Sequence, residues 1–513
     1  MGLARTWKER ISARAFGRRG LLLALTALVV ACGSQSAIAT GPVPAAVPAT
    51  VPSGDWPTFG YDSARSGGAP ASGITAANAR GLTPRSVHID GIADSAAVEL
   101  HAVKVDGRRH DLIVVDTTYG KTIAIDPATG HQLWEFRPPA VNAAPGNPQV
   151  ATATPTVDPN RRYLYSASPN GVIYKLSVAS GRQIWARSIT FDAGHEKLAS
   201  ALNVSGRYVV AVTGGYIGDA PPYDAHVVTI DRVSGRIAQV WNSECSSQHR
   251  LIRARLCSVT NARGDSAIWG RAGAVIEPHS GRILVATGNG RFDGRSSWGD
   301  SVLELTPNAS RLRHNWTPVN QLALSRADAD VGSTSPTLLP LYHGFRLAVQ
   351  GGKDGKLALL NVARLNGTAG PASGRLGGEL QQISAPGSDP TVYTAPAIWS
   401  HGGQIYVYVA TNSATAAYQL LGRGRPRLRL VWEKGIAGSS PVVAGGLLYI
   451  YDQMDGALVI RNPLSGAQIR SLPVPQGHWN SPIVVGGRII LPTGSYFDHR
   501  ASSTIAIYHL PGR

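Results

Sequence analysis

The sequence predicts an all-β fold, an eight-bladed β-propeller made of four-stranded antiparallel blades. Two repeated patterns predict it: a hairpin that commonly ends in Trp, and a second pair of strands, opening on a small residue and Pro, between successive hairpins. Helical periodicity is nearly absent, and 58 Gly residues supply the turns. One blade cannot bury both of its faces alone, so we expect the blades to close into a ring.

The first 39 residues have the pattern of an export signal. Basic residues lead into the apolar run LLLALTALVV, which is too short for a stable membrane span, and Cys32 follows closely. The segment VVAC resembles the bacterial lipobox, which implies that a lipid on Cys32 anchors the mature chain. The alternative is ordinary cleavage after Ala39, which would release a secreted protein.

Residues 40–54 are rich in Pro, Ala and Val and lack a helical or alternating pattern. This composition is typical of a semi-extended tether, as suits a domain held away from a membrane. We therefore expect a single propeller over residues 55–513, exported to the cell envelope and facing the periplasm or the exterior.

Two further cysteines, Cys245 and Cys257, flank the segment SSQHRLIRARL. In an oxidising compartment this pair predicts a disulfide that closes a surface loop. The alternative is a metal site that includes His249, but one His and the wide gap between the cysteines argue against it.

The formal net charge of +17 arises mostly from scattered Arg residues. A basic surface can bind nucleic acid or anionic lipid. Because the sequence has no basic stripe and no nucleic-acid motif, we expect a solvated basic surface, no nucleic-acid partner and a monomer.

The hairpin unit occurs eight times from the first blade to the last. In order, the copies span residues 122–136, 172–185, 227–241, 301–316, 357–367, 416–432, 457–469 and 503–510. The last copy has no strand after it, so we expect the segment PRSVHID, residues 84–90, to complete the final blade. The Trp residues that end hairpins are predicted to wedge between adjacent blades; they are Trp134, Trp185, Trp241 and Trp432.

These hairpins resemble the repeat of proteins that bind pyrroloquinoline quinone (PQQ), and DWPTFGYDSARSG resembles the start of quinoprotein dehydrogenases. The resemblance implies PQQ on the propeller axis over a Trp floor, with Ca²⁺ held by Glu, Asn and Asp side chains. Proteins with this repeat include both dehydrogenases and non-catalytic scaffolds, so the fold alone does not decide the function.

The segment from Ala267 to Leu305 resembles the family's cofactor region. Trp269 matches the floor position, where an indole face can stack on a planar quinone. Asn289 matches a Ca²⁺ ligand, since a hard cation accepts an amide oxygen. The alternatives are a core Trp and an Asn in a left-handed turn between two glycines.

In the family a catalytic base lies just before the next strand, where this chain has SRADADVG. Asp328 resembles the base that takes the alcohol proton, and a weak Ca²⁺ ligand, while Asp330 resembles the accessory carboxylate. Lys353 resembles the Lys that contacts the quinone oxygens. The alternatives are two carboxylates that cap a loop and a Lys exposed on a hairpin. The segment GHWNSP adds His478 and Trp479 to a blade start, which we expect near the axis.

Two departures from the family concern the cofactor. Tyr216 stands where the Ca²⁺-binding Glu is expected, and Asp219 could replace it only through a register shift. The adjacent Cys pair that covers PQQ in several relatives is absent. No Cys-x-x-Cys-His motif occurs, so we expect no haem, and an electron acceptor would be an external molecule.

Two functions follow as hypotheses. The first is PQQ-dependent oxidation of an alcohol or a sugar, with Ca²⁺ as a second cofactor. The alternative is a non-catalytic interaction protein of the cell envelope with a protein partner, similar to the lipoprotein propeller that assists outer-membrane barrel assembly.

Overall fold

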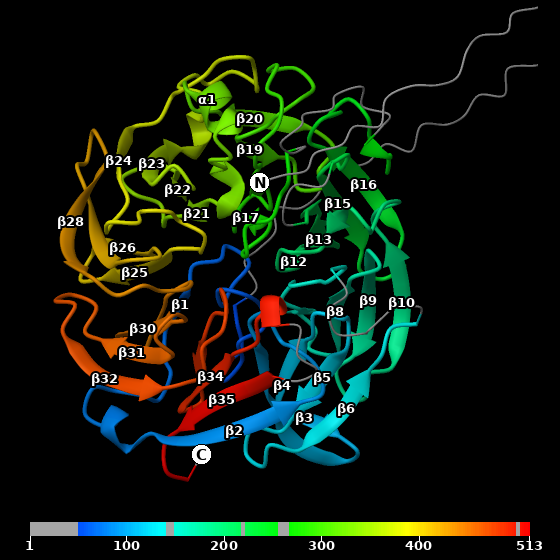
Figure 1. The fold of residues 1–513 in the computed structure, drawn as a ribbon, viewed down its shortest axis with the longest axis vertical. Helices are drawn as coiled ribbons and strands as arrows, with labels where there is room; N and C mark the ends of the chain where they lie inside the picture. Colours follow the sequence, from blue (N-terminus) through cyan, green and yellow to red (C-terminus); the bar gives the residue numbers. More distant parts are fainter. Residues whose placement is uncertain (1–49, 140–147, 217–220, 255–265, 499–502, 513) are drawn as a thin grey trace, which may run out of the picture. The chain divides into compact units, whose positions relative to one another are not determined.

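The computed structural model describes residues 50–139, 148–216, 221–254, 266–498 and 503–512 (Figure 1). They belong to one unit that spans Ala45–Arg513. Cys32, Asp219 and Cys257 lie outside the described residues, so the predicted lipid anchor, the alternative Ca²⁺ ligand and the disulfide stay predictions.

Eight antiparallel sheets stand around a common centre, which confirms the predicted eight-bladed propeller (Figure 1). In most blades the strands follow chain order, with the first strand near the centre of the ring and the last at its rim. The first three blades are β3 (Val98–Val105), β4 (Arg108–Asp116), β5 (Thr122–Ile125) and β6 (Gln132–Phe136); β7 (Thr156–Val157), β8 (Tyr163–Ser168), β9 (Val172–Ser177) and β10 (Gln183–Ser188); and β12 (Asn203–Ser205), β13 (Tyr208–Val212), β15 (His226–Asp231) and β16 (Ile237–Asn242). The next three are β17 (Val275–Ile276), β18 (Ile283–Ala286), β19 (Val302–Leu305) and β20 (Leu312–Trp316); β21 (Thr337–Leu338), β22 (Leu347–Gly351), β23 (Lys356–Asn361) and β24 (Gln381–Ser384); and β25 (Ala397–His401), β26 (Gln404–Ala410), β27 (Thr415–Leu421) and β28 (Arg427–Lys434).

The seventh and eighth blades use strands from both ends of the described chain. The seventh contains β29 (Val442–Ala444), β30 (Leu447–Asp452), β31 (Ala457–Arg461) and β32 (Gln468–Pro473), and the short β1 (Gly68–Ala69) adds to β29 in parallel. The eighth contains β33 (Ile483–Val485), β34 (Arg488–Pro492), β35 (Ser503–His509) and β2 (Thr83–Ile89).

The pairing of β2 with β35 closes the ring. The two strands run antiparallel from Thr83 opposite His509 to Ile89 opposite Ser503. This confirms the prediction that the early segment completes the last blade. Strands from near both ends of the described chain therefore share one sheet. As a result, the β35 edge of the last hairpin is paired with β2 and is not exposed.

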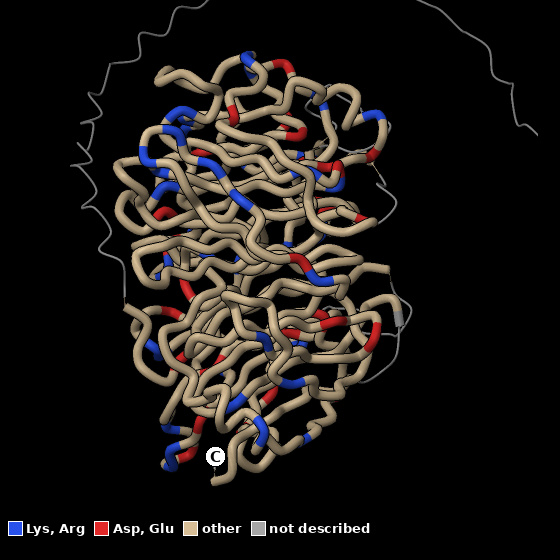
Figure 2. The backbone as a smooth tube through the Cα atoms, turned by 90° about the vertical axis from the view of Figure 1, so that its left-hand side faces the viewer, with Lys and Arg blue, Asp and Glu red and all other residues tan. Residues whose placement is uncertain are grey.

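Helical structure is sparse in the part of the chain that the structure describes. The elements are α1 (Gln321–Arg326) and 3-10 turns at Ala79–Gly81, Val331–Ser333, Val362–Arg364 and Tyr496–Asp498. A two-stranded ribbon, β11 (Glu196–Lys197) with β14 (Gly214–Gly215), leads into the third blade. Within the described residues no helix has the length and apolar character needed to cross a membrane. Basic and acidic residues are interspersed along the chain rather than gathered in one stripe (Figure 2).

The Trp residues that end hairpins pack between adjacent blades, as predicted. Trp134 of the first blade donates from Nε1 to the Val178 carbonyl of the second at 2.9 Å. Its ring lies against Gly181, where an added Cβ would stand 2.5 Å from Trp134 Cε3. Trp185 on Gly235 and Trp432 on Gly466 repeat the arrangement, with Cβ clearances of 2.8 and 2.7 Å. The hairpin Gly therefore serves as the seat for the preceding blade's Trp.

We predict that Gly181→Ala destabilises the propeller by more than backbone strain alone. Gly181 has φ +66° and the Trp134 ring above it, whereas Gly446 has φ +77° and no neighbour within 4 Å. Gly446→Ala should cost about 1–2 kcal/mol through its left-handed backbone. Gly181→Ala should cost about 1–3 kcal/mol more through overpacking. Urea unfolding measures both free energies, and equal losses would show that the Trp seat contributes nothing.

Candidate functional site

A cavity of about 560 Å³ lies where the blade-entry segments meet. Its lining comes from the segments before β7, β12, β17, β21, β25 and β33, so the cavity is at the centre of the ring. Its walls combine rings with charged groups, an arrangement typical of small-molecule sites. The groups that matter below are Lys197, Arg271 and Lys353, Asp328 and Asp330, and Trp269, Tyr393, Trp479 and Tyr496.

The structure brings all the predicted cofactor and catalytic residues together. Asp328 and Asp330 enter on the segment before β21, while Lys353 follows β22 in the same blade. Lys353 Nζ lies 3.1 Å from Asp328 Oδ1 and forms an ion pair with Asp330 Oδ2. Asn289, from the fourth blade, donates its side-chain Nδ2 to Asp328 Oδ1 at 2.6 Å and its main-chain N–H to Asp330 Oδ1 at 2.7 Å. Trp269 completes the cluster, with Lys353 Nζ 5.4 Å from its ring centroid.

Burial and pairing set the charges in this cluster. Burial disfavours the Lys353 ammonium, but the Asp330 and Asp328 carboxylates together outweigh that effect and raise the pKa of Lys353. Burial also raises the pKa of Asp330, although Lys353 opposes the shift. The Asp328 side chain is 52% exposed and lines the cavity, which makes it the accessible carboxylate of the pair.

The alternative that Asn289 is a left-handed turn residue is wrong. Asn289 is buried and its φ is not positive, nor is that of Gly288 or Gly290. The two glycines are required by close approach instead: a Cβ would stand 2.4 Å from Asp330 Oδ1 at Gly288 and 2.0 Å from Ser266 Oγ at Gly290. The loop therefore presses Asn289 against the carboxylates.

The structure also tests the alternatives for Asp330 and Lys353. The loop-capping alternative holds in part for Asp330, which makes no capping bond to the 3-10 turn Val331–Ser333 that follows it but accepts the main-chain N–H of Asn289 in the Gly-Asn-Gly loop. The Lys353 side chain is only 19% exposed and is held by two carboxylates, so it is not a solvated hairpin residue.

The residues present do not fit a Ca²⁺ ion, which takes six to eight oxygen ligands. Among the described residues, no three His, Cys, Asp or Glu side chains gather around a possible metal position. The two carboxylates are compensated by Lys353. At the expected Glu position, Tyr216 donates its hydroxyl to the Ala193 carbonyl at 3.2 Å. The buried Asn289 Oδ1, which has no partner in the described chain, is one remaining oxygen and not a cage.

The Trp269 floor is partly covered by other rings. Trp479 and Tyr393 have their centroids 6.1 and 6.3 Å from that of Trp269, and they stack on one another at 4.6 Å. A planar guest between two parallel rings needs about 7 Å, twice a carbon contact distance. A guest stacked on Trp269 therefore requires Trp479 to shift outward. Trp479 and His478 both line the cavity, as their place at a blade start predicts.

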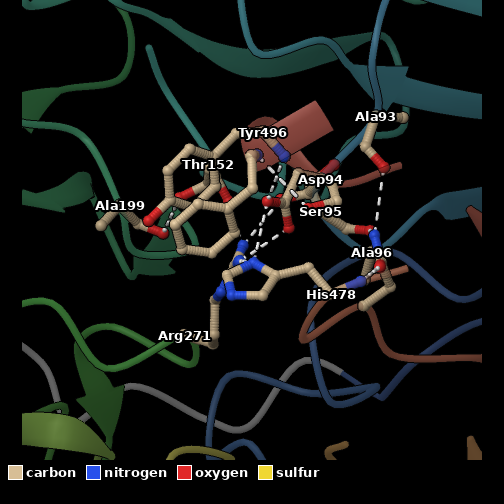
Figure 3. A network of polar contacts seen from close by, with 12 residues as sticks. Ala93, Asp94, Ser95, Ala96, Thr152, Ala199, Arg271, His478 and Tyr496 are labelled. Carbon is tan, nitrogen blue, oxygen red and sulfur yellow. Dashed lines mark hydrogen bonds and ion pairs between the residues drawn. The ribbon is translucent and has the colours of Figure 1, made fainter. Parts of the chain in front are cut away.

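A second polar cluster, which the sequence did not predict, borders the same cavity: Arg271, His478 and Tyr496 line it, and Asp94 lies buried behind them (Figure 3). Arg271 Nη2 donates to Asp94 Oδ1 at 2.7 Å, and Nη1 donates to the Asp94 carbonyl, also at 2.7 Å. His478 Nδ1 lies 2.9 Å from Asp94 Oδ2, which also accepts the Tyr496 N–H. Burial would raise the pKa of Asp94, but Arg271, His478 and the Tyr496 N–H together outweigh it, and the pKa is strongly lowered. Asp94 is thus a buried anion that neutralises Arg271.

Lys197 is the third cation of the cavity, and sequence reasoning missed it too. Its Nζ lies 4.2 Å from the centroid of the Tyr496 ring. No carboxylate or other hydrogen-bond acceptor among the described residues meets it. Burial, with a contribution from Arg271, lowers its pKa to about 7. The signal available in the sequence was weak: Arg271 follows Trp269 closely, but nothing local marks Lys197.

Comparisons with known proteins agree on the fold. Residues 99–331 match the family model described as outer membrane protein assembly factor BamB. No curated protein matches the chain. The quinohemoprotein alcohol dehydrogenase of Comamonas testosteroni has a TM-score of 0.64 at 15% identity, covering 90% of this chain and 81% of its own.

Two further solved structures are similar. A europium-containing methanol dehydrogenase has a TM-score of 0.61 at 14% identity, covering 89% of this chain and 98% of its own. BamB from Moraxella catarrhalis has a TM-score of 0.50 at 12% identity, covering 84% of this chain and 98% of its own. At these identities the likeness establishes a PQQ-type propeller fold, which confirms the predicted resemblance, and leaves the function open.

We predict that Asp94→Asn strongly destabilises the protein, because it leaves the Arg271 guanidinium buried without its anion. Removing one partner of a buried pair costs about 3–5 kcal/mol. The matched control is Asp90→Asn, which breaks a surface pair with Lys121 and should cost less than about 1 kcal/mol. The free energy of unfolding at neutral pH measures both. A loss for Asp94→Asn no larger than that of the control would contradict the role assigned to this pair.

Proposed function

We propose that this protein is a quinoprotein-type oxidoreductase that holds PQQ in the axial cavity and oxidises an alcohol or a sugar. One observation carries the proposal: the residues that the family resemblance assigns to cofactor and catalysis meet at one cavity. They are Trp269, Asn289, Asp328, Asp330 and Lys353. They come from separate chain segments in two blades, so no local repeat explains their convergence.

The donor set fits a planar quinone that carries carboxylates. Trp269 offers an indole face, and Lys197, Arg271 and Lys353 offer positive charge on different sides of the cavity. When bound, PQQ supplies the quinone carbonyl that accepts a hydride. The volume of about 560 Å³ lies within the range of small-molecule sites.

The chain's own residues supply proton transfer and orientation. Asp328 is the exposed carboxylate and would accept the proton of the substrate hydroxyl. Asn289 donates to Asp328 Oδ1 and leaves the other oxygen for that proton. Lys353 provides a fixed positive charge beside both, which would stabilise negative charge on an oxygen of the guest. No step is assigned to Ca²⁺, because the donor set does not fit it.

The proposal includes a location and partners. We place the protein in the cell envelope, held by a lipid on Cys32 in the membrane-anchored case and secreted in the alternative case. Electrons would leave through an external acceptor, since the sequence has no Cys-x-x-Cys-His motif.

A second candidate function is a non-catalytic scaffold that binds a protein partner in the envelope. The match of residues 99–331 to the BamB family supports it, as does the absence of a calcium-type donor set among the described residues. A scaffold does not require a carboxylate, a cation and an indole to meet in its central cavity, which is why the first proposal is preferred.

We predict that the purified protein binds PQQ in the presence of EDTA, because Lys353 and not a metal compensates the carboxylates. Titration followed by the quinone absorbance should saturate, and added Ca²⁺ should leave the affinity within about twofold. Trp269→Ala should weaken binding at least about tenfold, the loss of one aromatic contact. Trp399→Ala is the control, since Trp399 lies on β25 outside the cavity lining and should leave the affinity unchanged.

The loaded protein should reduce a dye with some alcohol or sugar. Asp328→Asn should keep PQQ affinity but lower turnover about 100-fold or more, the usual contribution of a general base. If no spectral change appears with or without Ca²⁺, the quinoprotein proposal fails and the scaffold remains. Binding only with Ca²⁺ would overturn the assignment of the charge to Lys353.

A further inference from the structure

We infer that the end of the axial cavity around Lys197 is a binding subsite for a carboxylate group of a small molecule. The inference deepens the proposed function, on which it rests for the kind of guest, and names what the cavity recognises at this end. The subsite is defined here by the Lys197 ammonium, the Tyr496 ring and the neighbouring Arg271.

The position of Lys197 is rigid. It lies on β11, which pairs with β14 through Lys197 opposite Gly214. The preceding residue, Glu196, points into the core, where Oε2 lies 3.1 Å from Nε2 of the fully buried His226. Because successive strand residues face opposite sides, anchoring Glu196 in the core directs Lys197 into the cavity. The residue is 6% exposed and lines the cavity.

Lys197 is the one cavity cation that forms no ion pair with a carboxylate among the described residues. Arg271 is neutralised by Asp94, and Lys353 by Asp330 and Asp328. Asp94 attracts Lys197 and opposes the lowering of its pKa, but it forms no ion pair with Lys197 and is already bound to Arg271, His478 and the Tyr496 N–H. The contact with the Tyr496 ring compensates only part of the cost of burying an ammonium. An anion entering from the cavity would supply the missing partner.

The surroundings select a carboxylate. One free ammonium matches a single negative charge, because both Nη groups of Arg271 are already used by Asp94 and by main-chain carbonyls. The flanking Tyr216, Tyr496 and Phe497 rings favour an organic body attached to that charge. Two sources have this chemistry: a carboxylate of PQQ itself, or the carboxylate of a hydroxy acid that serves as substrate.

The test measures ligand affinity at pH 6, where Lys197 is protonated because its pKa is about 7. Calorimetric titrations use gluconate, neutral glucose and PQQ as probes. The wild-type protein should bind gluconate or PQQ at least about tenfold more tightly than glucose, since a hydrogen bond between charged groups replaces a neutral one. Lys197→Met should lose this preference, and Lys197→Arg should keep it. Lys356→Met, on the exposed part of β23, is the matched control and should behave as wild type.

Thermal unfolding without ligand provides a readout that separates binding from structure. Removing an unpaired buried charge should raise the Tm of Lys197→Met above that of the wild type, so the variant is expected to fold better while binding worse. If Lys197→Met fails to fold, the preference retained or lost by Lys197→Gln decides in its place.

Competition between gluconate and PQQ tests the Lys197 subsite and the PQQ proposal independently. If gluconate still binds to the PQQ-loaded protein, the carboxylate belongs to a substrate; if PQQ blocks it, the carboxylate belongs to PQQ. Gluconate binding that depends on Lys197 without any PQQ binding would overturn the quinoprotein proposal and leave the subsite. Equal affinities for gluconate, PQQ and glucose, or a Lys197→Met variant that binds as wild type, would overturn the subsite.

Discussion

Closure of the ring through the β2–β35 pair is the constraint on which the rest of the structure depends. The pairing of Thr83–Ile89 with Ser503–His509 joins the two ends of the described chain in one sheet. Only in a closed ring do the segments that precede each innermost strand face one another across a centre. Trp134 seated on Gly181, and its equivalents in other blades, then hold the angle between neighbours. The cavity is thus a product of closure and not of any single blade.

The cavity is bordered by two clusters of charged residues, and the charges are paired differently in each. Around Lys353, two carboxylates and the Asn289 amide surround one ammonium. Around Arg271, one carboxylate is fully used by a guanidinium, a His and a main-chain N–H. The Lys353 cluster keeps one buried acceptor, Asn289 Oδ1, without a partner in the described chain, whereas every side-chain oxygen of Asp94 in the Arg271 cluster has a partner. Lys197 belongs to neither ion-pair cluster. A cation without an ion-pair partner, in a cavity lined by aromatic rings, is typical of a site that binds an organic anion.

The sequence was sufficient for the fold because the blade unit is a local pattern repeated along the chain. Strand, turn and Trp positions depend on neighbouring residues, and the orphan hairpin at 503–510 indicated which segment had to complete it. The cluster of Trp269, Asn289, Asp328 and Lys353 could be predicted only through a family resemblance. The Asp94–Arg271–His478 contacts could not, because they join residues 177 and 384 positions apart, across the ring. Likewise, the sequence presents the glycines beside Asn289 as turn residues, but their role is set by the side chains that pack on them, Asp330 on Gly288 and Ser266 on Gly290.

A diffraction experiment on crystals grown with saturating PQQ tests the central claim most directly. The claim predicts difference density for a flat molecule on the face of Trp269, with Trp479 displaced outward and a carboxylate within hydrogen-bonding distance of Lys197 Nζ. Trp479 still against Trp269, with the cavity free of the quinone, would contradict it. Density for PQQ on the outer surface of a blade would contradict it equally.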